Sequence, residues 1–204
     1  MKCLPRRRPK SWRYNLLDRI KVMHILVGVS GGIAAYKAAE VVSQLAQKDC
    51  TVDVCMTSNA ERFITPLTFT ALTGRATQCQ QQIQSSTQTE TYAHLYPSSE
   101  VDLFIVMPAT ASTIARLAVG LGEDPVSNAA LALKSDCIKQ VCPAMNTNMW
   151  QQASVQRNCR TLEHDGWEII GPETGRLACG TVGEGRLASP TRILDSVLQH
   201  KNKS

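Results

Sequence analysis

The order of apolar and amphipathic segments restricts the fold of this chain more than any other feature of its sequence. Apolar runs of strand length alternate with segments whose apolar residues recur at helical spacing. The clearest pair is the apolar run 24–30 and the segment after it, in which Ala38, Val41 and Leu45 lie three or four positions apart. Such alternation is typical of parallel strands joined by helical crossovers. The sequence therefore predicts an α/β fold, a three-layer Rossmann/flavodoxin-like sandwich with a mainly parallel sheet.

The remaining segments extend the same pattern. Residues 58–73 are predicted to form two short helical pieces separated at Pro66, because proline fits the first turn of a helix better than its interior. Residues 75–91, rich in Gln, Thr and Ser, are predicted to be irregular or a ragged edge element. The glycine-rich residues 171–189 are predicted to be a loop, with the composition of a mobile lid. Predicted strands cover 24–30, 51–56, 101–107, 137–142 and 167–170, and predicted helices cover 33–49, 111–119, 148–164 and 190–199.

The excess positive charge of the chain lies at its N-terminus. The net charge is +5, from 22 basic and 17 acidic residues, but residues 1–22 hold eight of the basic residues and one of the acidic ones. Residues 23–204 are therefore slightly acidic and lack the electrostatic footprint of a nucleic-acid-binding domain. Because periodic patterning begins at Met23, we expect residues 1–22 to be a loosely ordered extension or a non-native start. An organellar presequence and a polybasic contact for nucleic acid or anionic surfaces are alternative interpretations.

Cysteine spacing and apolar run length indicate the compartment. The eight cysteines include no CxxC pair and no Cys/His pattern of zinc-ligand spacing, and no signal-peptide core precedes the first predicted strand. We therefore expect free thiols, no bound metal and a reducing, cytoplasmic setting. No apolar stretch approaches the roughly 20 residues of a membrane span, so no membrane partner is expected.

Polar segments follow four of the predicted strands, at the edge of the sheet where open parallel sheets bind ligands. Ser30, Gly31 and Gly32 precede a helix whose free N–H groups suit an anion such as phosphate, although a plain tight turn is an alternative. Hydroxyl groups at two further strand ends bind the same phosphate or cap helices. A phosphorylated cofactor accounts for the three segments together better than three independent caps do. These hydroxyls belong to Thr57, Ser58, Thr110, Ser112 and Thr113.

Five segments resemble, in order, the flavin-dependent cysteine decarboxylase family: GVSGGIAAYKA, MTSNAERFITPLTFTALTG, PATAST, PAMNTNMW and ACGTVGEGRL. The similarity runs from about residue 23 to 199, so residues 23–204 are expected to form one flavoprotein decarboxylase domain. The resemblance implies FMN-dependent decarboxylation of 4'-phosphopantothenoylcysteine to 4'-phosphopantetheine in coenzyme A biosynthesis, and FMN binding at the interface of a homotrimer or a multiple of trimers. The implied FMN-binding residues are Ser30, Gly31, Gly32, Ile33, Thr57, Ser58, Ala109, Thr110, Ser112 and Thr113.

The same resemblance implies roles for five further residues. His94 matches a base near the flavin, and Cys179 matches the cysteine that protonates the enethiolate left by decarboxylation. Asn146 matches the residue that binds the substrate carboxylate, and Met145 and Arg186 are expected to contact substrate, Arg186 at a phosphate. In this family the flavin first oxidises the thiol-bearing carbon to a thioaldehyde, because loss of CO2 needs an electron sink.

The sequence departs from the family pattern at several positions. Ser112 stands where relatives have Asn, Leu187 stands where many relatives have the final Met of GEGRM, and Pro125 interrupts a segment that is usually apolar. A non-catalytic FMN-binding regulatory homologue and a decarboxylase of another cysteine-containing substrate are the alternative functions. Many bacterial relatives fuse this domain to a synthetase, so we expect a separate phosphopantothenoylcysteine synthetase to supply the substrate, or the substrate to be imported.

Overall fold

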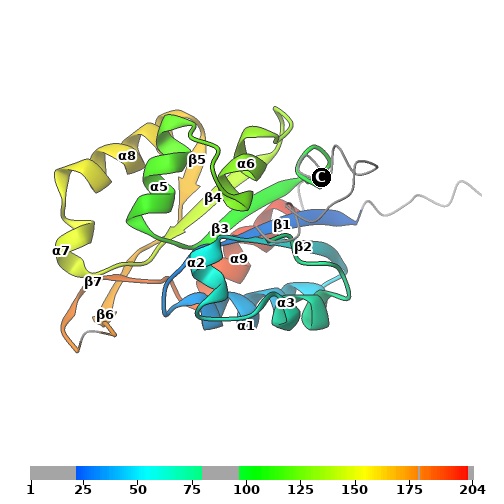
Figure 1. Cartoon of the computed structure of the whole chain (residues 1–204), viewed down its shortest axis with the longest axis horizontal. Coiled ribbons are helices and arrows are strands. Elements are labelled where there is room, and N and C mark those ends of the chain that lie inside the picture. Colours follow the sequence, from blue (N-terminus) through cyan, green and yellow to red (C-terminus); the bar gives the residue numbers. More distant parts are fainter. Residues whose placement is uncertain (1–21, 80–96, 179, 202–204) are drawn as a thin grey trace, which may run out of the picture.

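A parallel five-stranded sheet forms the centre of the protein (Figure 1). The computed structural model describes residues 22–79, 97–178 and 180–201, so His94, Cys179 and nearly all of the predicted N-terminal extension lie outside the described residues. The strand order is β2-β1-β3-β4-β5, with every neighbouring pair parallel. The strands match the five predicted apolar runs to within two residues at each end. They are Met23–Val29 (β1), Cys50–Met56 (β2), Leu103–Ala109 (β3), Ile138–Pro143 (β4) and Trp167–Ile169 (β5).

Helices cover both faces of the sheet and complete three layers (Figure 1). One face carries α1 (Ala35–Ala46), α3 (Pro66–Thr73) and α9 (Pro190–Lys201), and the other carries α5 (Ala111–Val119), α6 (Pro125–Leu131) and α8 (Ala153–His164). Two single helical turns, α2 (Ser58–Glu61) and α7 (Thr147–Trp150), follow β2 and β4. The predicted three-layer α/β sandwich is confirmed. Within the described part of the chain, no helix is long and apolar enough to cross a membrane.

Two apolar cores hold the layers together. Along β1, Ile25 and Val27 pack on the α1/α3/α9 side, and Leu26 between them packs on the α5/α8 side. Successive side chains of a strand point to opposite faces, and a parallel sheet covered by helices buries both. This is why the strands read as continuous apolar runs rather than alternating ones.

Three local predictions are wrong. The single helix predicted over 148–164 is two helices, because the backbone at Gln152 is extended and Gln156 Nε2 donates to the carbonyl oxygen of Trp150 at 2.7 Å. The loop predicted over 171–189 contains an antiparallel pair, β6 (Glu173–Arg176) and β7 (Val182–Arg186). The third miss is α6, which no predicted element covers.

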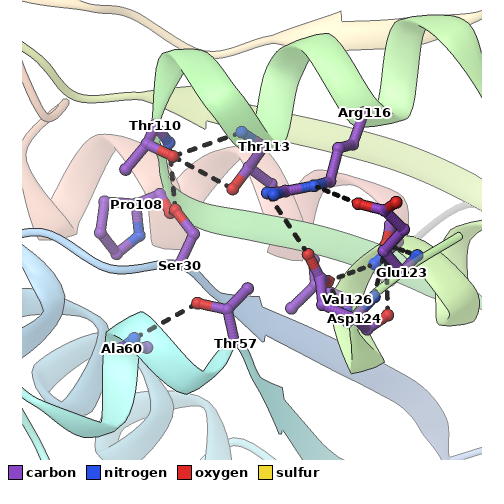
Figure 2. A network of polar contacts seen from close by, with 11 residues as sticks. Ser30, Thr57, Ala60, Pro108, Thr110, Thr113, Arg116, Glu123, Asp124 and Val126 are labelled. Atoms are coloured by element: carbon purple, nitrogen blue, oxygen red, sulfur yellow. Dashed lines mark hydrogen bonds and ion pairs between the residues drawn. The ribbon is translucent and has the colours of Figure 1, made fainter. Parts of the chain in front are cut away.

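Helix α6 begins at the proline that the sequence pattern marks as an interruption. Asp124 Oδ1 accepts hydrogen bonds from the backbone N–H groups of Val126 at 3.0 Å and Ser127 at 2.9 Å (Figure 2). Pro125 occupies the first helical position, where its missing N–H costs nothing. Arg116 of α5 lies 3.6 Å from the Asp124 carboxylate and joins the two helices. Pro125 therefore starts a capped helix.

A buried ion cluster joins the start of β1 to β2. Asp53 Oδ2 lies 2.6 Å from His24 Nε2, and Arg75 Nε donates to Asp53 Oδ1 at 2.6 Å. Arg75 leads into residues 76–79, which run along the edge strand β2, where Gln78 exchanges hydrogen bonds with Val54 and Met56. Burial opposes ionisation of Asp53, but the hydrogen bonds from His24 and Arg75 hold its pKa below the usual value. The cluster therefore contributes to stability in its ionised form.

Replacing Asp53 by Asn should lower the free energy of unfolding by about 3 kcal/mol at neutral pH, because the Arg75 guanidinium and the His24 ring lose their buried carboxylate partner. The pKa of Asp53 is lower in the folded than in the unfolded protein, so its contribution is present above about pH 4 and is lost as pH falls through the folded value. Denaturant unfolding at pH 7 and pH 3 checks this. The exposed Asp195→Asn control should change stability by less than about 0.5 kcal/mol, and an equal effect of both variants at pH 7 would contradict the prediction.

Candidate functional site

A cavity of about 720 Å³ lies beyond the carboxyl ends of β1, β3 and β4. This is the edge of an open parallel sheet at which ligands bind, and the volume falls within the roughly 300–1,000 Å³ of typical ligand pockets. Its walls come from the turn after β1, the start of α1, the ends of β3 and β4, and the β6–β7 hairpin. The lining residues include Gly31, Gly32, Ile33, Thr110, Met145, Asn146 and Arg186.

The predicted site residues divide into two groups. Those seven lining residues come from four separate segments of the chain and meet at the one cavity. The remaining described ones are not on its wall: Ser30, Thr57, Ser58, Ala109, Ser112 and Thr113.

Ser30 fixes the relative position of two strand ends. Its side chain is buried, and its Oγ donates to the carbonyl oxygen of Pro108 at 2.7 Å while accepting a hydrogen bond from the N–H of Thr110 at 3.0 Å (Figure 2). A buried hydroxyl with both a donor and an acceptor partner is satisfied within the protein. Ser30 therefore joins the turn after β1 to the turn after β3.

The threonines at the other strand ends cap helices in this structure. Thr57 Oγ1 accepts a hydrogen bond from the N–H of Ala60 at 3.2 Å, and Thr110 Oγ1 accepts one from the N–H of Thr113 at 3.3 Å (Figure 2). The hydroxyls of Thr110 and Thr113 also lie 3.1 Å apart. Capping, one of the two roles left open by the sequence, is thus observed for Thr57 and Thr110.

The two glycines after Ser30 serve different purposes. A Cβ on Gly31 would lie 2.5 Å from Cβ of Asn59 and 2.7 Å from its carbonyl carbon, so α2 packs directly on this backbone. A Cβ on Gly32 would meet only Thr110 Cγ2, at 4.0 Å. Gly31 is therefore required by packing, whereas Gly32 leaves its backbone open toward the cavity, as close approach of a ligand requires.

The segment after β4 and the hairpin are joined by backbone contacts. Asn146 Oδ1 accepts a hydrogen bond from the N–H of Asn148 at 2.8 Å and caps α7, and the N–H of Met145 donates to the carbonyl oxygen of Gly185 at 2.9 Å. Gly185 has φ +135°, and a Cβ there would overlap the carbonyl oxygen of Met145. The hairpin thus packs on the segment that carries Asn146.

Three lining residues carry charge, and all three are basic: Lys37, Arg176 and Arg186. Arg186 NH2 lies 3.3 Å from Glu173 Oε2 across the hairpin. Among the described residues on the wall there is no acid, so the cavity favours an anionic ligand. The sequence analysis did not identify Lys37 or Arg176 as site residues. Lys37 could have been found, because it belongs to the GVSGGIAAYKA motif and lies about one helical turn after the Ser30–Gly32 turn.

Large apolar side chains are exposed at the same cavity. Ile33 and Tyr36 are each 59% exposed, and Met149 is 46% exposed. The cavity wall therefore combines exposed apolar side chains with its three basic residues.

The described cysteines are unsuited to acid chemistry in this cavity. None of the six free cysteines among residues 22–79, 97–178 and 180–201 lies on its wall. Burial raises the pKa of Cys137 and of Cys159 to about 11, and it raises the pKa of Cys55 and Cys142 further. The expected free thiols are confirmed for these six.

The fold and the site define a flavin-type α/β protein, and comparison with known families gives the same class. The family model described as Flavoprotein matches residues 14–202, so the chain belongs to the Flavoprotein family. It is 40% identical over 170 residues to "Coenzyme A biosynthesis bifunctional protein CoaBC" of Vibrio vulnificus, covering 83% of this chain and 41% of that protein. It is 39% identical over 176 residues to the protein of the same name from Escherichia coli K12, covering 86% and 42% respectively. The chain thus spans less than half the length of these relatives.

Solved structures share the fold. A PPC decarboxylase variant complexed with pantothenoylaminoethenethiol superposes with a TM-score of 0.81 at 23% identity, covering 89% of this chain and 100% of that one. The FMN binding protein AtHal3 gives a TM-score of 0.77 at 25% identity, covering 89% and 98%.

The two glycines should respond differently to alanine. We expect Gly31→Ala to lower the free energy of unfolding by about 2 kcal/mol, because the new methyl group overlaps Asn59. Gly32→Ala should change it by less than about 0.5 kcal/mol, since its Cβ enters open space. Denaturant unfolding of both variants measures the difference, and equal losses would refute the division of roles.

Proposed function

We propose that this protein catalyses FMN-dependent decarboxylation of 4'-phosphopantothenoylcysteine to 4'-phosphopantetheine in coenzyme A biosynthesis. The observation that carries the proposal is the convergence of Gly32, Asn146 and three basic residues on one cavity at the carboxyl edge of the sheet. The substrate is anionic at both ends, and every charged residue that the structure describes on the cavity wall is basic. The relatives named for coenzyme A biosynthesis align with 83% to 86% of the chain.

The described residues fit FMN. Gly32 leaves a space that a side chain would fill, and it lies at the start of the segment leading into α1, whose N-terminal N–H groups suit a phosphate. Ile33 and Thr110 belong to the same wall. Six further residues lie at or just after the carboxyl ends of β1, β2 and β3 but not on the wall: Ser30, Thr57, Ser58, Ala109, Ser112 and Thr113. When bound, FMN supplies the electron sink that decarboxylation of an N-acyl cysteine needs.

Roles for the chain's own residues follow from the motif matches. Asn146 binds the substrate carboxylate through its amide, a neutral group suited to a charge that departs as CO2. Its loop is fixed by the contact between Met145 and Gly185, so Met145 lies beside the same ligand. Arg186 contributes positive charge from the hairpin. His94 acts as the base and Cys179 as the acid that protonates the enethiolate.

Assembly and setting complete the proposal. We assign residues 23–204 to one decarboxylase domain that works as a homotrimer or a multiple of trimers. The exposed side chains of Ile33, Tyr36 and Met149 at the cavity support a second copy covering this face. A cytoplasmic setting and a separate phosphopantothenoylcysteine synthetase stay predictions of the sequence.

The purified protein should be yellow and should release CO2 from 4'-phosphopantothenoylcysteine, measured with a carboxyl-labelled substrate alongside the flavin absorbance. Asn146→Ala should retain FMN and lose at least about tenfold in turnover, as expected for one lost hydrogen bond to a charged group. Gly32→Ala should retain less FMN. A colourless protein that takes up no FMN would reject the proposal, and an FMN-loaded protein without turnover would favour the regulatory homologue.

Cys179→Ser should separate the two halves of the reaction. We expect CO2 to be released while 4'-phosphopantetheine fails to form, because the serine hydroxyl is a poor acid for the enethiolate. Product analysis by mass spectrometry distinguishes the enethiol from the thiol. Cys50→Ser, at the start of β2 and off the cavity wall, is the matched control and should form the thiol normally. Equal loss of both steps in Cys179→Ser would show that its assigned role is wrong.

A further inference from the structure

The three basic residues of the cavity wall are not equivalent. Arg186 faces Glu173, whose carboxylate also accepts a hydrogen bond from the N–H of Ser189 at 3.1 Å and lies 3.8 Å from Arg192 NH1. Its guanidinium lies against Gly175, where a Cβ would come within 2.9 Å of NH1. The charge of Arg186 is therefore partly compensated by a carboxylate that it shares with Arg192, and its guanidinium is held in place by the hairpin.

Lys37 lies at the other side of the site. It belongs to the first turn of α1, directly after the Gly31–Ile33 turn proposed to hold FMN. Its positive charge is therefore closest to the flavin side of the cavity.

Arg176 is the remaining basic residue of the cavity wall, and it is positioned to bind a ligand. It is the last residue of β6, it is exposed, and it lines the cavity immediately before Leu177, whose N–H donates to the carbonyl oxygen of Thr181 at 2.8 Å. Within the described residues, its side chain forms no ion pair and no hydrogen bond.

We propose that Arg176 binds the terminal phosphate of the substrate and determines the preference of this site for a phosphorylated over an unphosphorylated cysteine conjugate. The inference rests on the proposed function and names the residue that reads the substrate's phosphorylated end. The carboxylate and the phosphate lie at opposite ends of the substrate. Asn146 and Arg176 line the same cavity, so a substrate whose carboxylate is held at Asn146 extends its phosphate end along a wall on which Arg176 offers an uncompensated charge.

The chemistry of the two groups matches. An arginine presents parallel N–H donors to two phosphate oxygens, which a lysine ammonium does not reproduce. Exposure at the cavity wall lets the phosphate keep part of its hydration, so binding it there costs little desolvation. Arg186, whose charge is partly compensated by Glu173, supplies less attraction for a dianion.

Steady-state kinetics of the FMN-loaded protein tests this with a substrate pair, 4'-phosphopantothenoylcysteine and pantothenoylcysteine. For Arg176→Gln we expect KM for the phosphorylated substrate to rise about tenfold, the factor that about 1.4 kcal/mol represents, with kcat within twofold. KM for the unphosphorylated substrate should stay within twofold. Arg176→Lys should fall between the wild type and Arg176→Gln. Arg160→Gln, an exposed arginine of α8 away from the cavity, controls for the loss of one surface charge and should match the wild type on both substrates.

A binding measurement without turnover provides a second readout. Calorimetric titration with 4'-phosphopantetheine and with pantetheine should show that Arg176→Gln weakens only the phosphorylated product, about tenfold, while its FMN content stays that of the wild type. Equal weakening of both products, no weakening of either, or loss of FMN would overturn the inference and leave the proposed function standing. A wild-type protein that decarboxylates neither substrate would overturn both.

Discussion

The site depends on a single buried hydroxyl that joins two strand ends. Ser30 donates to the carbonyl oxygen of Pro108 and accepts from the N–H of Thr110, so the turns after β1 and β3 cannot shift independently (Figure 2). Both turns lead into helices, and those helices pack on opposite faces of the sheet. The N-terminal ends of both helices are therefore held at one edge of the sheet. The Ser30 hydroxyl is engaged in this bridge. The backbone that lies open toward the cavity is that of the nearby Gly32.

The sheet could be predicted from the sequence because its strands are buried on both faces. Five apolar runs of strand length give the five strands, and helical spacing between them gives the crossovers. Helix α6 was not predicted because its start signal is ambiguous. Asp124 followed by Pro125 is also typical of a turn that interrupts regular structure. The β6–β7 hairpin was missed for a different reason. Its glycines at 183 and 185 are selected by close approach to Thr147 and Met145, residues distant in sequence, and no local pattern reports such a contact.

The candidate site was predictable in its segments and not in its individual side chains. Motifs after β1, β3 and β4 do meet at one cavity, since parallel strands bring their carboxyl ends to one edge. Which residues of these motifs line the cavity wall depends on tertiary contacts, and the spacing of residues in the sequence does not encode those contacts. Gly31 and Gly32 are equivalent in the sequence, yet one meets Asn59 and the other meets open space. Arg176 sits in a glycine-rich stretch without periodicity, and only pairing in the hairpin brings it to the cavity wall.

The distribution of charge across the fold explains how a slightly acidic domain presents a basic site. Asp53 in β2 and Asp102 just before β3 are each paired with basic side chains: Asp53 with His24 and Arg75, Asp102 with Lys134. Glu173 at the hairpin is likewise matched to Arg186 and Arg192. These carboxylates are therefore compensated locally by basic side chains. The field inside the cavity is therefore set by the cations on its own wall, and net charge alone does not reveal which ligand such a domain binds.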